Sequence, residues 1–573
     1  MPFQSPLVLS LAALTVTLIA MVWRKLYPTP YPGIPYNQES ARRITGDIPD
    51  LVPVIKATNE FSDALFSITT RKLGVPIAQL LFPGIRNPLI VLEDPREIED
   101  IVLRRNKEFD KASMAIDIFA PMFPRASISQ FTTPELKAQK RLWADVMGSE
   151  FLHKAAAPNI YKATLELLDL WRLKASTVYR DKPFSVHEDF QNAALDAIWV
   201  AVVGEEPGVT RHEIHKLRSQ ITGHTNTDNG ASLGEPPRGI FLKEEVAYIA
   251  DTIFRNSNSP SPKWAQKLET YTPRYRKFRR TVSAEIGLVM RKAVERFQRL
   301  EIGNLEAGEF DTCMMDLVLR RQVVEAKKAK RPLTDPTKDQ NMLDEMFVML
   351  VGGHDSTANA LTWFVRYMEA FPNVQDELRT ALKAAFSSAQ PSVEEILSAD
   401  VPYLDATCEE GFRLAGVAKA NLRRALVDTE ILGCKIPKGA EVIMNYHLNR
   451  DPVPVEESKR SLGSQAAAAK FGDGLHADAG RDIASFNPRR WLVKDINTGK
   501  ETFNPHALPS LAFGGGYRGC AGRKLASMEF RIVVVLLVLN LEFLELPEEF
   551  KTMRATEKIF RQPDMPYARV KAL

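Results

Sequence analysis

One cysteine near the C-terminus constrains this chain more than any other residue. Cys520 lies in the segment 513–522, which reads F-G-G-G-Y-R-G-C-A-G, and an apolar helix is predicted directly after it, over residues 525–541. The glycines let the backbone turn tightly and approach a flat ligand. The start of the helix, nearby backbone N–H groups and Arg518 all favour the thiolate, which is the form that binds metal. The pattern predicts a metal-ligating cysteine, and a glycine-rich turn with an inert cysteine is the alternative.

The same segment matches F-x-x-G-x-R-x-C-x-G at every defined position. It resembles the haem-binding loop of the cytochrome P-450 superfamily. The resemblance implies haem b as cofactor, with Cys520 as the axial ligand of the iron, Phe513 shielding the sulfur and Arg518 near a haem propionate. It also implies that Gly516 and Gly522 belong to the cofactor-binding loop. A thiolate ligand donates electron density to the iron and favours cleavage of the O–O bond.

A second motif lies on a helix predicted over residues 402–414 from the spacing of its apolar side chains. Glu410 and Arg413 are three residues apart on this helix and are therefore neighbours. Alone, such a pair is usually a solvated ion pair. Here it resembles the E-x-x-R helix of the same family, whose F-x-P-x-R segment supplies a third member, Arg490. The resemblance implies a structural role for a buried carboxylate between two guanidinium groups.

Two further basic positions are expected near the haem propionates. Arg423 falls about where the family places a second propionate-binding arginine, and Arg424 is the alternative. The family's W-x-x-x-R helix aligns best with residues 136–141, where the tryptophan is missing. Lys140 or Arg141 must then carry the charge, and a basic helix with an exposed face is the alternative.

A long apolar helix is predicted over residues 341–370, with G-G-H-D-S-T at 352–357 in its middle. This stretch resembles the family's oxygen-handling motif, [AG]-G-x-[DE]-T-[TS]. The resemblance implies that a local opening of the helix holds a water and that Asp355 with Ser356 or Thr357 relays protons to dioxygen. Ser356 replaces the family's first threonine and lacks the methyl group that restrains the hydroxyl. The alternative is a kinked helix whose polar side chains bond to backbone carbonyls.

The N-terminus is predicted to anchor the protein in a membrane. Residues 7–23 are uncharged and apolar, and about 17 such residues are near the lower limit for spanning a bilayer. Arg24 and Lys25 follow directly and favour a cytosolic location for the rest of the chain. The proline-rich residues 27–35 predict a stiff spacer. This order resembles microsomal members of the family, which implies contact with membrane lipid and a catalytic domain on the cytosolic face of the endoplasmic reticulum.

The resemblance implies a mostly α fold, in which a large helical domain with a minor β region follows a single transmembrane anchor. We expect the anchor at residues 1–26, a proline-rich hinge at 27–50 and the haem-thiolate catalytic domain at 51–573. Residues 433–444 predict a hairpin turn that leads into a strand. The four cysteines are too scattered for a disulfide framework. A net charge of +4 gives no basic footprint for nucleic acid.

Electrons are expected from a separate flavoprotein, because neither glycine run follows a strand as a flavin or nicotinamide fingerprint would. The resemblance implies an NADPH-cytochrome reductase in the same membrane, with cytochrome b5 as an additional candidate. Basic residues that flank the cysteine would steer such an acidic donor, and ordinary solvation is the alternative. These residues are Lys137, Lys140, Arg141, Arg518, Arg523, Lys524 and Arg531.

The sequence therefore predicts a haem-thiolate monooxygenase that inserts one atom of O2 into an apolar organic substrate with NADPH-derived electrons. The chain resembles filamentous-fungal members of the family, which implies a terpenoid, polyketide or alkaloid intermediate as substrate. A fatty-acid or xenobiotic hydroxylase is the alternative. A non-oxygenating haem-thiolate isomerase or a non-catalytic haem-binding protein would not need Asp355 and Ser356.

The substrate pocket is expected to be mainly apolar, with Lys419 and Lys558 as polar anchors. A Gly/Asn/Pro-rich loop at residues 226–239 falls where the family has a mobile substrate-access lid. The low-complexity residues 461–470 make their segment longer than the family usually allows, and they predict a surface insertion.

Overall fold

The computed structural model describes residues 10, 14, 15, 17, 21, 23–84, 86–222, 238–259, 261–301, 312–332, 335–472, 482–495 and 498–573. Most of the predicted anchor at 7–23 and most of the predicted lid at 226–239 lie outside these residues. Within the described ranges, no helix combines the length and the apolar composition needed to cross a bilayer. The chain divides into two compact units. The sheet unit comprises Met1–Ser113, Lys419–Ala479 and Gly514–Arg518, and the helical unit comprises Met114–Ala418, Gly480–Phe513 and Gly519–Leu573.

The sheet unit is built around a five-stranded sheet with the strand order β1-β2-β8-β5-β3. Its neighbouring strands are antiparallel except for β2 and β8, in which Leu89 lies opposite Glu441. Strand β8 is the strand predicted at the end of residues 433–444. The elements of this unit are α2 (Gln38–Ala41), α3 (Ile48–Thr58), α4 (Phe61–Phe66), a π-helical turn (Ser67–Arg71), β1 (Ile77–Leu80), β2 (Leu89–Leu92), α5 (Pro95–Leu103), β3 (Phe109–Lys111), β5 (Ala420–Ala425), β6 (Thr429–Ile431), β7 (Cys434–Ile436), β8 (Glu441–Asn445) and α21 (Leu462–Phe471).

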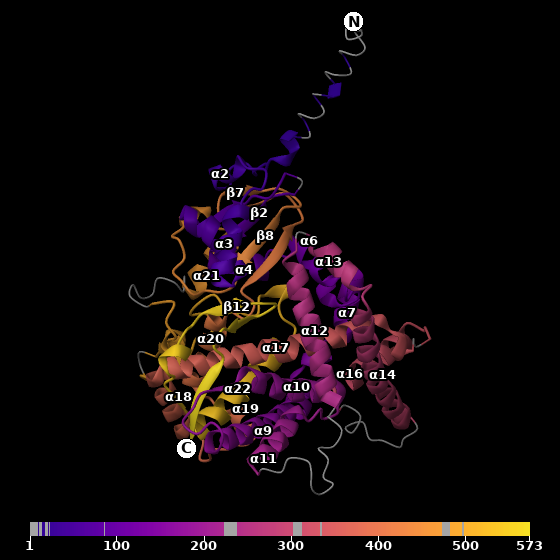
Figure 1. Ribbon diagram of the computed structural model, residues 1–573, viewed down its shortest axis with the longest axis vertical. Helices are drawn as coiled ribbons and strands as arrows, with labels where there is room; N and C mark the ends of the chain where they lie inside the picture. Colours follow the sequence, from indigo (N-terminus) through magenta and orange to yellow (C-terminus); the bar gives the residue numbers. More distant parts are fainter. Residues whose placement is uncertain are drawn as a thin grey trace. The chain divides into compact units, whose positions relative to one another are not determined.

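The helical unit confirms the mostly α fold. Helix α17 (Gln340–Ala370), predicted over residues 341–370, runs through its middle, and α9, α10 and α22 pack together on one side of it (Figure 1). The other elements are α6 (Ser113–Phe119), α7 (Pro134–Leu142), α8 (Ser149–Phe151), α9 (Ala157–Ser176), β4 (Phe184–Ser185), α10 (His187–Val203), α11 (Val209–Ile221), α12 (Arg238–Ser257), α13 (Pro262–Glu269), α14 (Pro273–Glu301), α16 (Met314–Lys328), α18 (Pro372–Ala385), α19 (Val393–Ser398), α20 (Pro402–Ala415), β9 (Leu492–Lys494), β10 (Glu501–Phe503), α22 (Arg523–Asn540), β11 (Leu541–Leu544), β12 (Ala555–Glu557), β13 (Arg561–Pro563) and β14 (Tyr567–Ala572).

Aromatic side chains join three helices of this unit into one core. The ring of Phe530 on α22 lies 5.5 Å from that of Phe364 on α17 and 4.5 Å from that of Phe412 on α20, measured between centroids. All three side chains are buried. Packed aromatic pairs add directional attraction to the burial of their large apolar area. The helix that follows Cys520 is therefore held by both α17 and α20.

The proline-rich segment after the predicted anchor is hydrogen-bonded to the sheet unit. Gln79 on β1 is fully buried, and its Nε2 donates to the carbonyls of Tyr31 at 2.9 Å and Ile34 at 2.8 Å. Its Oε1 accepts from the Tyr31 N–H at 2.8 Å. The helix α3 begins at Ile48, inside the predicted hinge at 27–50. The stretch from Tyr31 to Ile34 is therefore attached to the sheet.

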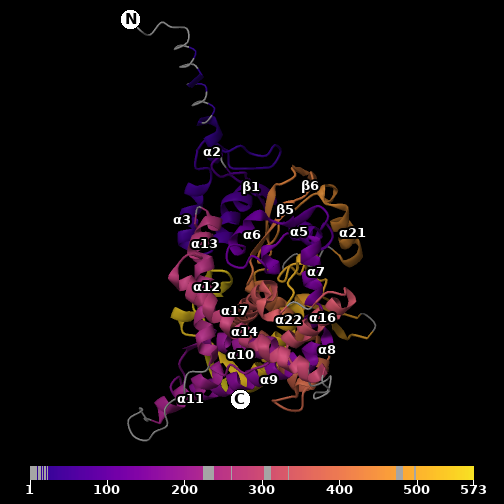
Figure 2. The same cartoon turned by 90° about the vertical axis from the view of Figure 1, so that its right-hand side faces the viewer.

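The low-complexity segment forms the helix α21, which lies beside α5 (Figure 2). Ser461 caps this helix, because its side chain accepts from the Ser464 N–H at 3.2 Å. Four consecutive alanines follow, and alanine has the highest intrinsic helix propensity. Leu462 is 83% exposed, so the segment lies at the surface as predicted.

Candidate active site

The cysteine loop is closed by its own backbone. The Cys520 N–H donates to the Phe513 carbonyl at 2.9 Å, and α22 begins three residues after the cysteine. The Cys520 side chain is accessible but crowded, and this partial burial raises the pKa of its thiol. Hydrogen bonds from the N–H groups of Gly522 and Arg523, and the charge of Arg523, act in the opposite direction. Burial outweighs these contributions, so the pKa of the thiol is raised, and the nearby charge that favours the thiolate belongs to Arg523 rather than to Arg518.

The glycines of the loop allow a close approach of backbone to helix α5 in the sheet unit. A Cβ atom on Gly515 would lie 2.4 Å from Leu103 Cδ2, and one on Gly516 would lie 2.3 Å from the Val102 carbonyl oxygen. Gly516 also has a φ of +61°, which side chains disfavour. Larger residues at either position would push the loop away from α5.

Phe513 is held from two sides within the helical unit. Its ring makes an edge-on contact with Phe412 at 4.9 Å between centroids. The guanidinium carbon of Arg523 lies 5.7 Å from the same ring. The aromatic side chain predicted to shield the sulfur is therefore fixed by its neighbours.

Arg423 offers a buried hydrogen-bond donor in the sheet unit. Its side chain is 4% exposed, and Nη1 donates to Asn421 Oδ1 at 2.9 Å. Its Nη2 is buried and has no partner in the described part of the protein. An orphaned donor of this kind is rare in folded proteins and fits the carboxylate of a haem propionate. Arg424 donates instead to Ser113 Oγ at 3.4 Å, so the geometry favours Arg423.

Arg518 belongs to the same unit and forms an ion pair within it. Its Nε lies 3.1 Å from Asp110 Oδ1, and both side chains are nearly buried. Burial lowers the pKa of Arg518, the charge of Asp110 raises it, and the charge of Arg423 lowers it again. The charges of Arg423 and Arg518, which repel each other, suit an anionic ligand.

The basic residues predicted for α7 lie in the helical unit. Arg141 is exposed and Lys140 is half-buried. Burial raises the pKa of Glu345 on α17, hydrogen bonds from Ser127 lower it, and the charge of Lys140 lowers it further. The structure thus brings Lys140 toward Glu345.

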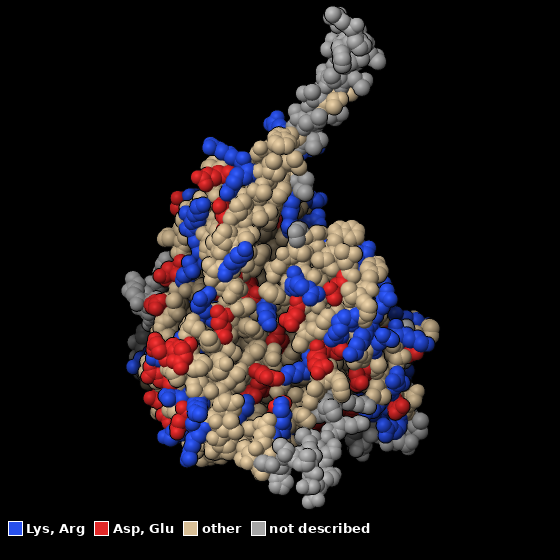
Figure 3. Space-filling model, viewed as in Figure 1, with Lys and Arg blue, Asp and Glu red and all other residues tan. Residues whose placement is uncertain are grey.

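Two of the seven basic residues predicted to face an electron donor are used internally. Arg531 donates to the carbonyls of Ile396 at 2.9 Å and Ala399 at 2.6 Å, and it pairs with Asp405. Arg518 pairs with Asp110, as described above. On the face drawn in Figure 3, basic and acidic side chains are interspersed. The exposed members of the set are Lys137, Arg141, Arg523 and Lys524.

Glu410 is the centre of a buried cluster in the helical unit. Its two oxygens accept from Arg413 at 2.8 and 2.7 Å, and Oε1 also accepts from Arg490 Nε at 2.9 Å. The Asn487 N–H and Trp491 Nε1 complete its shell, each at 2.9 Å. Burial raises the pKa of Glu410, but the charges and hydrogen bonds of the two arginines outweigh it and hold this pKa below its usual range. The cluster ties α20 to the segment that follows it.

The polar residues of α17 are bonded, and the helix is continuous from Gln340 to Ala370. Ser356 Oγ donates to the Gly352 carbonyl at 2.5 Å, and Thr357 Oγ1 donates to the Gly353 carbonyl at 2.9 Å. Each hydroxyl is bonded to a backbone carbonyl four residues earlier in the same helix, and the helix is not interrupted there. The predicted local opening is therefore wrong.

Asp355 points toward α10. Its Oδ1 accepts from Gln191 Nε2 at 3.0 Å and from Asn359 Nδ2, on its own helix, at 3.3 Å. One turn before Gln191, His187 lies 3.3 Å from the hydroxyl of Thr362 on α17. Two residues of α10, which the sequence did not single out, therefore set the surroundings of the predicted proton donor.

Sequence reasoning also missed Glu529. This side chain lies on α22, is 5% exposed and is hydrogen-bonded to Thr357. Burial raises its pKa to about 8, while the bond to Thr357 acts in the opposite direction. The signal was present in the sequence, because Glu529 is the one acidic residue of the apolar stretch 525–541. A carboxylic acid that keeps its proton near neutral pH thus lies beside the predicted relay.

Lys419 is not a substrate anchor. Its side chain is buried, and its Nζ lies 2.7 Å from Glu60 Oε2 and 3.1 Å from Asp63 Oδ1. Burial raises the pKa of Asp63, but the charges of Lys419 and Arg71 lower it to about 2. Two carboxylates from α4 and its flank therefore neutralise the lysine. Lys558 lies 3.6 Å from Asp251 in the helical unit and is largely accessible.

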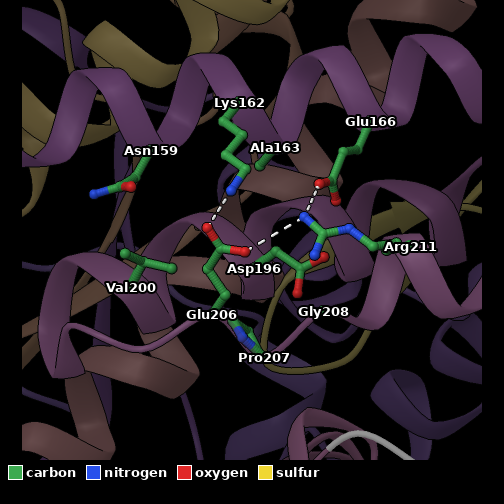
Figure 4. Close-up of a pocket in the computed structure, with 10 residues that line it drawn as sticks. All are labelled: Asn159, Lys162, Ala163, Glu166, Asp196, Val200, Glu206, Pro207, Gly208 and Arg211. Carbon is green, nitrogen blue, oxygen red and sulfur yellow. Dashed lines mark hydrogen bonds and ion pairs between the residues drawn. The ribbon is translucent and has the colours of Figure 1, made fainter. Parts of the chain in front are cut away.

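A small pocket of about 20 Å³ between α9, α10 and α11 is lined in part by charged side chains that pair with one another (Figure 4). Glu206 accepts from Lys162, and Arg211 bridges Glu166 and Glu206. Asp196, below them, accepts from two backbone N–H groups at the start of α11. These ion pairs and hydrogen bonds hold the segment between α10 and α11 against α9. None of the predicted site residues lines this pocket.

Comparisons with known proteins point to one family. A family model described as Cytochrome P450 matches residues 81–453 and 484–568. The chain is 29% identical to the cytochrome P450 monooxygenase TRI13 of Fusarium sporotrichioides, over 97% of each chain. It is 29% identical to the cytochrome P450 monooxygenase xilC of Penicillium crustosum, over 98% of this chain and 96% of that one. The Hps1-dma1 cluster cytochrome P450 monooxygenase cyp3.1 of Dothistroma septosporum is 32% identical over 40% of this chain and 77% of its own length.

Proposed function

The chain belongs to the cytochrome P450 family of oxygenating enzymes, and from this premise we propose that it oxidises an apolar intermediate of fungal secondary metabolism. The proposed substrate is a terpenoid, polyketide or alkaloid intermediate, and fatty-acid or xenobiotic hydroxylation is the second candidate. The relative from Dothistroma septosporum, named for a cluster, supports the first choice. The observation that carries the reaction class is the accessible Cys520 at the start of α22, inside a loop closed by its own backbone.

The residues present fit haem b. Cys520 would hold the iron, and Arg423, with its orphaned Nη2, and Arg518 would hold the propionates. When bound, the haem supplies the activation of dioxygen. Glu529 holds a proton near neutral pH and is hydrogen-bonded to the hydroxyl of Thr357. Asp355, held by Gln191, is the second acid of the proposed relay.

We also propose an NADPH-cytochrome reductase as electron donor, with cytochrome b5 as an additional one. The exposed Lys137, Arg141, Arg523 and Lys524 would attract an acidic partner. A membrane anchor at residues 7–23 would hold the protein on the cytosolic face of the endoplasmic reticulum, where such a donor is available. The support for this location is the uncharged apolar run followed by Arg24 and Lys25.

The reaction class is tested by the carbon monoxide spectrum of the reduced protein. Thiolate ligation gives a strongly red-shifted Soret band, and we expect Cys520→Ala to lose it. Cys434→Ala, which changes another accessible cysteine, is the matched control and keeps the band. A band that survives in Cys520→Ala contradicts the assignment. Oxygen-dependent NADPH consumption with a reductase then separates a monooxygenase from an isomerase or a haem carrier, and metabolite comparison after gene deletion identifies the substrate.

A further inference from the structure

The segment Glu457 to Phe471, here called the brace, is bound to helix α5 by two ion pairs, of which one is buried and the other has a half-exposed Glu457. Arg460 forms two hydrogen bonds with Asp94, at 2.6 and 2.9 Å, and both side chains are buried. Arg96 of α5 in turn donates two hydrogen bonds to Glu457 of the brace, at 3.0 and 2.7 Å. Paired contacts of this kind fix orientation as well as distance. The low-complexity insertion is therefore attached rigidly to α5.

Two further acids of α5 receive the start of α21. Ser461 Oγ donates to Asp100 Oδ2 at 2.7 Å and lies 3.2 Å from Glu97 Oε2, and the Ser461 N–H donates to the same Glu97 oxygen at 3.2 Å. A Cβ atom on Gly463 would lie 2.1 Å from Asp100 Oδ1. Asp94, Glu97 and Asp100 are all at most 1% exposed. These three buried carboxylates of α5 and its N-cap thus each accept a hydrogen bond from the brace, in addition to bonds from the Glu97 N–H, Arg105 and Arg104.

The last turn of α5 carries the cysteine loop. Val102 and Leu103 contact Gly515 and Gly516 so closely that neither glycine has room for a side chain. These contacts and those of the brace lie on one nine-residue helix. A helix of this length moves as a rigid rod of about 14 Å. A shift at Asp100 is therefore passed to Val102 and Leu103 within the same turn.

We propose that the brace is a positioning element for the haem-binding loop. It holds α5 in place, and through Val102 and Leu103 it fixes the glycines that precede Cys520. Loosening the brace frees the loop and weakens the thiolate bond to iron, even though no residue of the brace belongs to the predicted haem site. The inference rests on the proposed function only where its test measures the carbon monoxide spectrum, which requires bound haem.

The test uses two serines of the same segment in the full-length, haem-loaded protein. Ser461→Ala removes the hydroxyl group that forms hydrogen bonds with Asp100 and Glu97. Ser458→Ala changes an exposed serine three residues earlier. Ser461→Thr keeps the hydroxyl and serves as the rescue. Gly463→Ala is a second perturbation, because it presses directly on Asp100. Backbone hydrogen exchange over residues 513–520 and the carbon monoxide spectrum are measured for all four variants.

We expect Ser461→Ala and Gly463→Ala to raise exchange in residues 513–520 roughly tenfold, the usual effect of one lost buried hydrogen bond. Both should also move part of the carbon monoxide band from the thiolate position to the unligated one. Ser458→Ala and Ser461→Thr should match the unchanged protein. Faster exchange confined to α21 and α5, or equal effects of Ser458→Ala and Ser461→Ala, overturns the proposal. If the unchanged protein itself lacks the thiolate band, the proposed function fails, and the exchange rates alone decide the role of the brace.

Discussion

At the scale of single residues, the buried charge of Glu410 is surrounded by donors that satisfy both of its oxygens. Glu410 has no exposed surface, yet five hydrogen bonds converge on its two oxygens. Arg413 also donates to the Ile483 carbonyl, and Arg490 donates to the Asp482 carbonyl. Taking these groups from water is costly, so the cluster stabilises the fold only while it is complete.

We therefore expect Glu410→Ala to destabilise the helical unit by about 3–5 kcal/mol, because Arg413 and Arg490 would remain as buried charges without their carboxylate. Little haem-loaded protein should accumulate, and urea unfolding should occur at lower concentration. Glu394→Ala, at an exposed glutamate near the start of α19, is the control. Wild-type stability of Glu410→Ala would show that the cluster is not needed for folding.

Glu529 predicts a pH dependence of stability. Its pKa is about 8 in the folded protein and about 4.3 in an unfolded chain. Between these values the folded protein binds more protons than the unfolded one, so stability falls as the pH rises from about 4.5 to about 8. Glu529→Gln should flatten this part of the profile, since the amide does not titrate. Urea midpoints across this range measure the effect, and a slope that is the same in both proteins contradicts it. Glu369 also has a raised pKa, near 8, and it is present in the unchanged protein and in Glu529→Gln. Its contribution to the slope is therefore the same in both proteins.

At the scale of elements, the spacing of apolar residues and short motifs predicted the helices that depend on local sequence. The apolar faces of α17 and α20 gave their positions to within a few residues, and the F-x-P-x-R segment identified Arg490. The misses involve partners far away in the chain. Lys419 is neutralised by residues more than 350 positions earlier. Glu529 stands out in the sequence as the acidic residue of an apolar stretch, but only the fold shows that Thr357 faces it.

The glycine pair of α17 illustrates the same limit. A local opening of the helix was predicted for the stretch that contains this pair, but a Cβ atom on Gly353 would lie 2.7 Å from Ile198 Cγ1 of α10, whereas one on Gly352 would meet nothing within 4 Å. Gly353 therefore permits the close packing of two helices. Gly352 lies one turn before Ser356, on a side of the helix with free space.

Alanine at each glycine should separate these roles. Gly353→Ala should destabilise the protein by about 1–3 kcal/mol, because Ile198 must move within a packed interface. Gly352→Ala should stabilise the helix by up to about 1 kcal/mol, since alanine is the better helix former. Thermal unfolding of both variants measures the difference. If both substitutions change the stability in the same direction, Gly353 does not have the packing role described here.

Gly352→Ala has a second expected consequence. The added methyl group lies one turn before Ser356, a residue of the predicted proton relay, and occupies space that is open in the described structure. Because it would narrow that space, substrate turnover should fall while stability does not. Comparing product formation with unfolding in this one variant distinguishes a role in the reaction from a role in folding.

At the scale of the whole molecule, the N-terminal segment is attached to the sheet unit by residues that follow the predicted anchor. The Gly84 N–H donates to the Leu26 carbonyl at 2.8 Å, and the Gln79 N–H donates to the Pro35 carbonyl at 2.8 Å. Together with the bonds from the Gln79 side chain, they hold residues 26–35 against the sheet. The attachment therefore begins directly after Arg24 and Lys25.

This arrangement predicts where the chain can be shortened. Deletion of residues 2–23 removes the apolar run and leaves Leu26, so every described bond to Gly84 and Gln79 is kept. We expect this variant to leave the membrane fraction while it retains haem and the thiolate band, because about 17 apolar residues supply the proposed anchor. Deletion of residues 2–35 is the matched comparison, and it should lose haem-loaded protein, since the buried Gln79 is then left without its partners. Sedimentation with membranes and the carbon monoxide spectrum are measured for both. If the shorter deletion still sediments with membranes, another surface of the protein binds them and residues 7–23 are not the sole anchor.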